Sequence, residues 1–327
     1  LVHMAGLLGS RVLLSSATLP PALLQGLFAA YLDGRRVFQN NRGIPGGPLK
    51  VCCAWFDENQ SVEGGHADES SFAQAHTAFV QKRLASLHTA QATDLRRRAR
   101  IAVWSAFSAK PEVTRPALAK LMLSEAIALH EDSQNNSIDP ITGKRLSFGL
   151  VRMANIDPLI DVARALLALT APPGVRIHLC VYHSRHPLLV RSAIEARLDR
   201  LLQRSQPEAV FKDAEIRGLL DGSPQMDHLF VVLATSVLEV GRDFDADWAI
   251  VEPSSMRAII QLAGRVRRHR ASQIQRPNMV LLDTNLRALE HPASPAFQRP
   301  GFESRNFQLS SHSLTQLLRP DEASVIN

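Results

Sequence analysis

Short apolar runs alternate with helix-like spacings of apolar residues over the second half of the chain. Strands are predicted at 148–153, 176–182, 229–234, 248–251 and 279–282, and helices at 157–169, 187–202 and 255–268. Strands that alternate with helices are typical of a parallel sheet with helices on both faces. The pattern therefore predicts an α/β fold for this part of the chain.

The first half has a less regular pattern. Short strands are predicted at 11–15 and 49–56, around a helix at 22–32 that stops near Gly34 and a loop at 40–48 rich in Asn, Gly and Pro. From 61 to 143 the spacing is helical, with apolar or aromatic positions three or four residues apart from Phe72 to Leu87. Further helices are predicted at 95–104 and 117–130. We interpret 57–146 as a mostly helical insertion.

Composition indicates a soluble globular protein, with 45% hydrophobic and 21% charged residues and a net charge of +6. The basic excess permits a polyanionic partner but is weak evidence alone. The apolar start lacks the basic residues of a signal peptide, and no run reaches the ~18 apolar residues that cross a bilayer. Cys52, Cys53 and Cys180 form no ligand pattern, so we expect reduced thiols in the cytoplasm and no metal site.

The strongest chemical signal lies between 231 and 270. The predicted strand ends at Ala234, which places the Thr235 hydroxyl at a strand's carboxyl end, where open α/β sheets bind ligands. Gly241 allows a tight turn, and Asp243 follows it. On the next predicted helix, Gln261, Arg265 and Arg268 are spaced i, i+4 and i+7, so they share one face. Two arginines there could neutralise phosphate oxygens, although a solvated basic helix end is the simpler alternative.

These segments resemble motifs of superfamily-2 helicases. ATSVLEVGRDFD and QLAGRVRR resemble motifs V and VI, Ser16-Ala17-Thr18 resembles motif III, and Val181–Arg185 resembles the motif IV region. Three further features are similar to the CRISPR-associated helicase–nucleases of type I systems: Glu239-Val240-Gly241, the YHSRH segment and FQRPGFE at 297–303. Among these, the chain most resembles the type I-F form fused to an adaptation protein.

The resemblance implies an organisation in RecA-like lobes. Residues 1–56 would end the first lobe, 57–146 would be the insertion, 147–290 the second lobe, and 291–327 an irregular segment leading to a further domain. The intact protein would be an ATP-dependent helicase acting on single-stranded DNA in CRISPR interference, with its nuclease domain elsewhere. A Cascade-type surveillance complex is the expected partner, and an adaptation nuclease or a phage inhibitor protein are candidates. No membrane association is expected.

The resemblance also implies residue roles. Arg265 and Arg268 would be arginine fingers. The nucleotide cleft would be lined by Gly241, Asp243 and Gln261, the DNA backbone would be contacted by Thr235, Ser236, His183, Ser184 and Arg185, and nucleotide state would be coupled to lobe closure by Ser16 and Thr18. ATP and Mg²⁺ would be held mainly by first-lobe residues that this sequence lacks, so the chain alone should not hydrolyse ATP.

Several alternatives stay open. His183 could be a structural histidine, Ser16-Ala17-Thr18 a helix cap, and Arg96–Arg100 a solvated helix face instead of a DNA track. Phe56-Asp57-Glu58 and Gly143-Lys144 imitate nucleotide-binding motifs, but their order and flanking residues do not fit. At the level of the whole protein, the rivals are a duplex-DNA translocase or remodeller and a non-catalytic docking module for a partner or an inhibitor.

Overall fold

The computed structural model describes residues 1–16, 19–58, 60–91, 94–239, 241–270, 273–298 and 301–326. The chain divides into two compact units, the first unit at 1–92 and the second unit at 93–327. The boundary suggested at 56/57 falls within a β-hairpin of the first unit, and the one at 146/147 falls within a strand of the second. In the part of the chain described, no helix is both long enough and apolar enough to cross a membrane.

The first unit packs two long helices on a hairpin, and a short N-terminal helix packs on the first of them. Its elements are α1 (Val2–Leu8), α2 (Pro21–Arg42), β1 (Val51–Phe56), β2 (Ser61–His66) and α3 (Glu69–Gln91). The two strands pair antiparallel, with Val51 opposite His66. A small core forms around Phe28 and Phe72, whose rings stack with centroids 4.2 Å apart. The hairpin was not predicted, whereas strand β1 and helix α3 were.

Two predictions in the first unit are wrong. Residues 11–15 form no strand, and Leu13 is 86% exposed, because no described strand lies beside this segment to pair with its backbone. Helix α2 does not stop at Gly34 but continues to Arg42. A Cβ on Gly34 would overlap the His3 carbonyl oxygen, and one on Gly6 would overlap that of Tyr31. The glycines therefore let the backbones of α1 and α2 touch.

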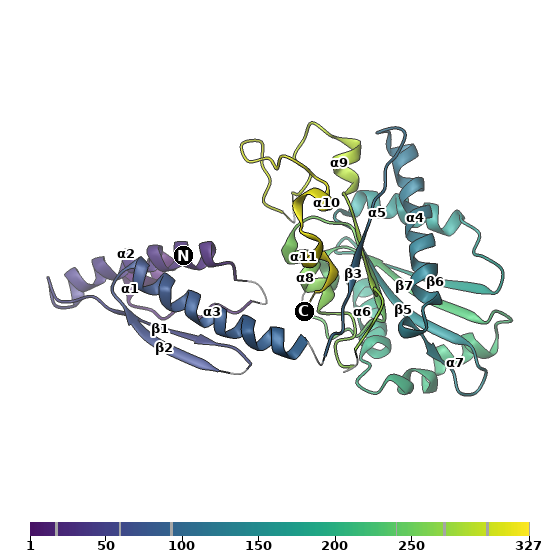
Figure 1. Ribbon diagram of the computed structural model, residues 1–327, viewed down its shortest axis with the longest axis horizontal. Coiled ribbons are helices and arrows are strands. Elements are labelled where there is room, and N and C mark those ends of the chain that lie inside the picture. The colour runs from purple at the N-terminus through teal and green to yellow at the C-terminus, as the bar shows by residue number, and fades with distance from the viewer. Residues whose placement is uncertain are drawn as a thin grey trace. The chain divides into compact units, whose positions relative to one another are not determined.

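The second unit is built on a parallel sheet in the order β3-β9-β8-β5-β7-β6 (Figure 1). The strands are β3 (Ala99–Ala102), β5 (Arg145–Arg152), β6 (Val175–Tyr182), β7 (Asp227–Ala234), β8 (Trp248–Val251) and β9 (Met279–Leu282). The two-residue strand β4 (Ser137–Ile138) pairs antiparallel with β5. The predicted α/β fold is confirmed.

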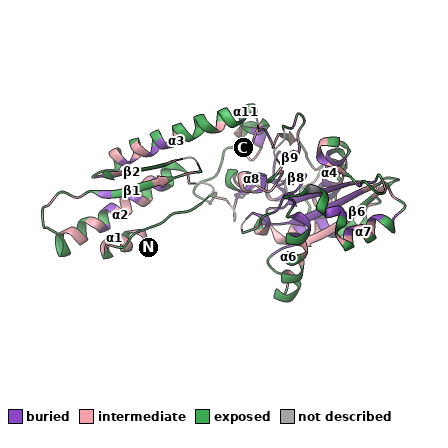
Figure 2. Cartoon of the chain, turned by 90° about the horizontal axis from the view of Figure 1, so that it is seen from below, coloured by how far each residue is buried: buried purple, intermediate pink, exposed green. Residues whose placement is uncertain are grey.

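Helices cover both faces of this sheet. One face packs against α4 (Pro111–Glu131) and α5 (Ile156–Ala168), and the other against α6 (Leu188–Leu202), α7 (Ala214–Asp221) and α8 (Met256–Ala263). The central strands β5, β7, β8 and β9 are almost entirely buried, whereas β3 and β6 at the two edges of the sheet are only partly buried (Figure 2). Short helices occur at η1 (Ser133–Asn135), η2 (Pro207–Lys212), η3 (Ser236–Leu238), α9 (Leu286–Glu290), α10 (Leu314–Leu317) and α11 (Pro320–Ser324).

The structure corrects two predicted helices in the second unit. Residues 95–104 contain the edge strand β3, which pairs parallel with β9, so the tertiary contact outweighs the local helical spacing. The helix predicted at 255–268 ends at Ala263 and is followed by a turn in which Arg267 has a positive φ of 47°. Arg265 and Arg268 therefore do not project from a helix face shared with Gln261.

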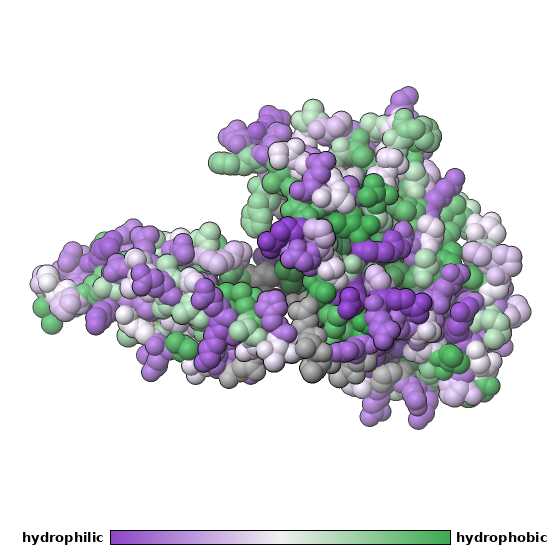
Figure 3. Space-filling model, in the orientation of Figure 1, coloured by the Kyte–Doolittle hydropathy of each residue, from purple (hydrophilic) through white to green (hydrophobic). Residues whose placement is uncertain are grey.

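The C-terminal segment, described at 291–298 and 301–326, is mostly irregular. Its last residues return to the sheet, where Val325 bridges to Arg98 and Ile326 is buried in the core. Phe302, Phe307 and Leu309 remain exposed on it. Hydrophobic residues accordingly show on the visible face of the second unit around this segment (Figure 3).

Candidate functional site

Four loops leave the carboxyl edge of the sheet at one level. Tyr182 of β6 and Arg152 of β5 both pair with Ala234 of β7, and Arg152 also pairs with Val251 of β8. The residues that follow these strand ends therefore begin adjacent loops, about 4.8 Å apart from one strand to the next. Thr235 and His183, which belong to separate predicted motifs, are brought side by side in this way.

The loop after β7 carries the predicted motif V residues. Thr235 precedes the 3-10 helix η3 and is buried, whereas Ser236 is exposed. Gly241 has a φ of 70°, a left-handed conformation that glycine adopts without strain. Asp243 follows as an exposed side chain. The loop thus presents a serine hydroxyl and a carboxylate to solvent at the sheet edge.

The turn after α8 carries both candidate arginine fingers. The Arg265 Nη2 donates to the Glu239 carbonyl oxygen at 2.9 Å, and burial lowers the pKa of Arg265, with nearby Arg268 adding to the effect. The Arg268 Nε lies 2.7 Å from Asp243 Oδ1. Arg265, Arg268 and Asp243 therefore form one group, while half-buried Gln261 stays on helix α8.

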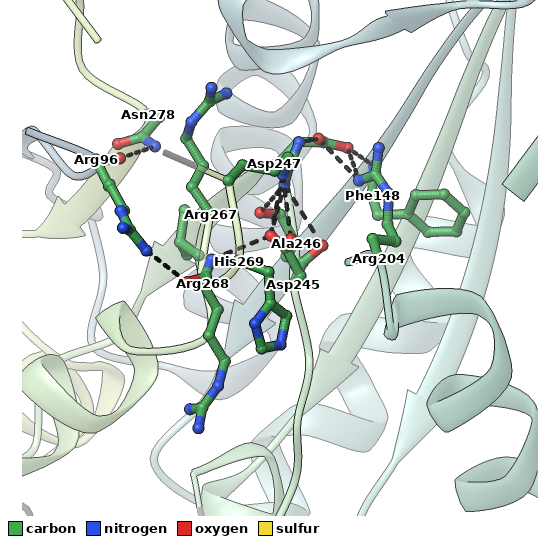
Figure 4. Close-up of polar contacts among 12 residues, drawn as sticks. Arg96, Phe148, Arg204, Asp245, Ala246, Asp247, Arg267, Arg268, His269 and Asn278 are labelled. Atoms are coloured by element: carbon green, nitrogen blue, oxygen red, sulfur yellow. Dashed lines mark hydrogen bonds and ion pairs between the residues drawn. The ribbon is translucent and has the colours of Figure 1, made fainter. Parts of the chain in front are cut away.

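A buried ionic network lies behind this turn (Figure 4). Arg270 donates to both carboxylate oxygens of Asp245 and to Asp247, and Arg204 donates through Nη1 to both oxygens of Asp247 at 2.9 Å. The Phe148 N–H of β5 also donates to Asp247, at 2.7 Å. The two aspartates are almost fully buried. Each charge has an opposite charge or several donors beside it, as burial requires.

Arg96 and Arg97 also support this turn. Arg96 Nη1 donates to the Arg268 carbonyl oxygen at 2.6 Å, and Arg97 Nε donates to that of Val266 at 2.9 Å. Burial and neighbouring Arg96 lower the pKa of Arg97 to about 10. The solvated-face interpretation of this arginine run is therefore wrong for Arg96 and Arg97, which brace the turn.

A second buried ion pair ties the loop after β7 to β5. The Arg152 Nε lies 2.9 Å from Glu239 Oε1, and its Nη1 donates to the Glu252 carbonyl oxygen at 2.9 Å. Burial raises the pKa of Glu239 even though Arg152 acts to lower it. The carboxylate of Glu252 accepts the backbone N–H groups of Ala154 and Leu286. Three of the loops at the edge are thereby linked.

The predicted nucleic-acid contacts after β6 differ in exposure. Ser184 and Arg185 are exposed, and Arg185 forms an ion pair with Asp157 in the first turn of α5. His183 is buried and stacks on His186, with ring centroids 3.9 Å apart. Burial lowers the pKa of His183, and His186 adds to the effect. His183 therefore fits the structural alternative better than a backbone contact.

The two coupling residues fall in the first unit. Ser16 is exposed, and Thr18 lies outside the described residues. The two segments that imitate nucleotide-binding motifs, at Asp57 and at Lys144, make hydrogen bonds within the fold. Asp57 accepts the Gln60 N–H at 2.8 Å in the hairpin turn, and Lys144 donates to the carbonyl oxygens of Leu220 and Ser223.

Sequence reasoning missed Asp245, Asp247 and Arg270. The available signal was the series Asp243, Asp245 and Asp247, three carboxylates at alternate positions just before an apolar strand. Carboxylates so close to a buried strand require cationic partners. The sequence could not show which arginines supply them, because Arg204 is 43 residues from Asp247.

Comparison with known proteins gives consistent similarities. Residues 145–271 match the family described as CRISPR-associated nuclease/helicase Cas3, C-terminal. The chain is 54% identical over 323 residues to the CRISPR-associated nuclease/helicase Cas3 subtype I-F/YPEST of Pseudomonas aeruginosa. It is 49% identical over 325 residues to the protein of the same description from Pectobacterium atrosepticum. Each alignment covers 98% of this chain, which spans only 29% of each relative.

A solved structure shows the same fold at lower sequence identity. The crystal structure of T. fusca Cas3 with ATP is 18% identical and superimposes with a TM-score of 0.51. The superposition covers 87% of this chain and 28% of that one. The likeness supports the RecA-like arrangement of the sheet and helices.

Proposed function

Because the chain belongs to the CRISPR-associated nuclease/helicase family, as its motifs indicated, we propose that it supplies the second motor lobe of an ATP-driven single-stranded DNA translocase. The whole activity would belong to a longer protein, since the chain spans 29% of its relatives. The observation that carries the proposal is the group of Arg265, Arg268 and Asp243 at one end of the buried ionic network.

ATP is the proposed substrate of this group. Charge on the γ-phosphoryl oxygens must be stabilised during transfer, and guanidinium groups placed beside these oxygens can stabilise it. The Arg268 side chain is exposed and pairs with Asp243, while a longer contact of 3.4 Å joins its Nη1 to the Gly264 carbonyl oxygen. Arg268 could exchange Asp243 for a phosphate oxygen as the cleft closes. Gly241 and Gln261 would complete the nucleotide side of the lobe.

Single-stranded DNA is proposed to cross the carboxyl edge of the sheet. Ser236, Ser184 and Arg185 are exposed on adjacent loops and can bind backbone phosphates, which requires no base sequence. Thr235 and His183 are buried and would support the loops that carry these exposed residues. Ser16 and Thr18 keep their proposed role in coupling nucleotide state to lobe closure.

Magnesium and the other phosphate-binding groups are proposed to come from outside this chain. Among the described residues, no three His, Cys, Asp or Glu side chains converge as a metal site. Mg²⁺ would screen the phosphate charge when bound by the intact protein. We accordingly expect no ATP turnover by the chain alone. A Cascade-type surveillance complex is the proposed partner in interference, with an adaptation nuclease or a phage inhibitor protein as further candidates.

The test is DNA-stimulated ATP hydrolysis by the intact protein carrying Arg268→Ala. Loss of a finger that acts in the transition state should lower kcat by roughly a thousandfold or more, with little change in ATP binding. Arg276→Ala is the matched control, because Arg276 is also an exposed arginine with a carboxylate partner, Asp132. Unchanged turnover in Arg268→Ala would overturn the proposal.

Two other functions predict different results. A duplex translocase would hydrolyse ATP but fail to displace a strand from a forked substrate. A docking module would still capture its partner after Arg265→Ala and Arg268→Ala. The intact finger group favours the motor over the docking module.

A further inference from the structure

The backbone of Arg268 is fixed on both sides by side chains from elsewhere in the chain. Its N–H donates to Asp245 Oδ1 at 3.1 Å, and its carbonyl oxygen accepts from Arg96 Nη1 at 2.6 Å. Asp245 is fully buried. Asp243 and Asp245 therefore bind different parts of Arg268. Asp243 pairs with the guanidinium, and Asp245 accepts a hydrogen bond from the main-chain N–H.

The hydrogen bonds of Asp245 and Arg96 to the main chain of Arg268, here called the clamp, hold a strained turn. Arg267, the residue before Arg268, has a φ of 47°, and a non-glycine residue in that conformation costs about 1–3 kcal/mol. Its N–H donates to the Ala246 carbonyl oxygen at 2.9 Å, and the Ala246 N–H donates to the Arg265 carbonyl oxygen at 2.8 Å. The main chain of the turn is thus hydrogen-bonded to Asp245 and Ala246 at three residues, Arg265, Arg267 and Arg268.

The carboxylate of Asp245 is itself immobilised. Arg270 donates to it through Nε at 3.1 Å and Nη2 at 2.8 Å, and the same guanidinium donates to Asp247. Asp247 in turn accepts the Phe148 N–H of the central strand β5. An unbroken chain of hydrogen bonds therefore runs from the middle of the sheet to the main chain of Arg268.

We propose that Asp245 is a positioning residue for ATP hydrolysis. It fixes the main chain of Arg268 and so limits the positions that the Arg268 guanidinium can take when it binds the phosphate. The inference rests on the proposed function. Because Asp245 is fully buried, it would act on the nucleotide only through Arg268. A displacement of about 1 Å at a catalytic group can lower a rate about 100-fold, so the clamp is expected to affect kcat.

The experiment measures ATP turnover of the intact protein with Asp245→Asn, Arg268→Ala and the two combined. Asn keeps the size of the side chain and one acceptor oxygen but loses the charge that holds Arg270. Asp245→Asn should lower kcat by about 10- to 100-fold. The KM for ATP should change by less than about threefold, because residues outside this chain are proposed to hold most of the ATP. In the Arg268→Ala background the same substitution should cause no further loss, because groups that act as a unit are not additive.

The outcomes separate the inference from the proposed function. Additive losses in the double variant, or unchanged kcat in Asp245→Asn, would overturn the positioning role. Unchanged kcat in Arg268→Ala would overturn the proposed function instead. Asp221→Asn is the matched control, because Asp221 also pairs with an arginine, Arg217, but at the exposed end of α7. Thermal unfolding and ATP binding by each variant confirm that the proteins compared are folded.

Discussion

Arg268 and Asp243 form an exposed ion pair, with 2.7 Å between Nε and Oδ1 and side chains 40% and 48% exposed. Arg152 and Glu239 form a pair of similar length, 2.9 Å, with side chains 0% and 6% exposed. Both pairs join residues of the candidate site, but water screens only the first. The exposed pair can exchange partners at small cost, whereas the buried pair is fixed.

The two pairs should differ in their contribution to stability. Arg152→Ala leaves the Glu239 carboxylate buried without its cation and should lower the free energy of unfolding by about 3–5 kcal/mol. Asp243→Ala, the matched control, should change it by less than about 1 kcal/mol. Urea denaturation of the purified chain, followed by circular dichroism, gives both values. Equal losses would mean that burial does not distinguish these pairs.

Two glycines of helix α2 should respond oppositely to alanine. No atom lies within 4 Å of the position that an alanine Cβ would take at Gly26, so Gly26→Ala should stabilise the helix by about 0.5–1 kcal/mol. Gly34→Ala places a methyl group against the His3 carbonyl oxygen and should destabilise the first unit by about 1–3 kcal/mol. Hydrogen exchange of α2 peptides measures both effects. Slower exchange in Gly34→Ala would contradict the close packing of α1 on α2.

Stability should decrease as the pH falls through the titration range of His178. Burial, with help from His228, lowers the pKa of His178 from 6.5 to about 4. The unfolded chain therefore binds this proton more tightly, so the stability is complete above about pH 6.5 and is lost as the pH falls toward 4. Burial also lowers the pKa of His228, which acts in the same direction.

His178→Phe tests this dependence. Phe keeps the stacking on Phe230, whose ring centroid lies 4.1 Å from that of His178, and removes the titrating group. Urea denaturation between about pH 4.5 and 7 should give a shallower loss of stability for the variant than for the wild type. Each proton contributes at most about 1.4 kcal/mol per pH unit, and partial solvent access reduces this. Identical slopes in both proteins would show that other groups control the effect.

From 145 to 263 the sequence alone predicted the order of the strands β5, β6, β7 and β8 and the helices α5, α6 and α8, but it missed helix α7. Apolar runs such as 229–234 are buried on both faces of a parallel sheet, so they remain uninterrupted in the sequence. The residues of the helicase-like motifs could also be identified from the sequence, because the backbone conformation of Gly241 and the polar residues after β7 depend on local chemistry.

Only the tertiary structure decided the elements whose partners are distant in sequence. Strand β3 exists because β9, about 180 residues away, accepts it at the sheet edge, and the arginines around it looked helical without that partner. Gly34 looked like a helix stop because nothing in its neighbourhood revealed α1 packed against it. The spacing of apolar residues indicates which backbone conformation is preferred locally. Packing decides between conformations that are close in energy.

The same limit applied to the candidate site. Arg265 and Arg268 were found by their motif, but their placement on one helix face was wrong because α8 ends at Ala263. What fixes Arg268 is a carboxylate 23 residues away and a guanidinium 172 residues away. Residue types and motif order are local properties that the sequence states directly. The position of a charged side chain depends on which opposite charges the fold brings to it, and only the folded chain determines that.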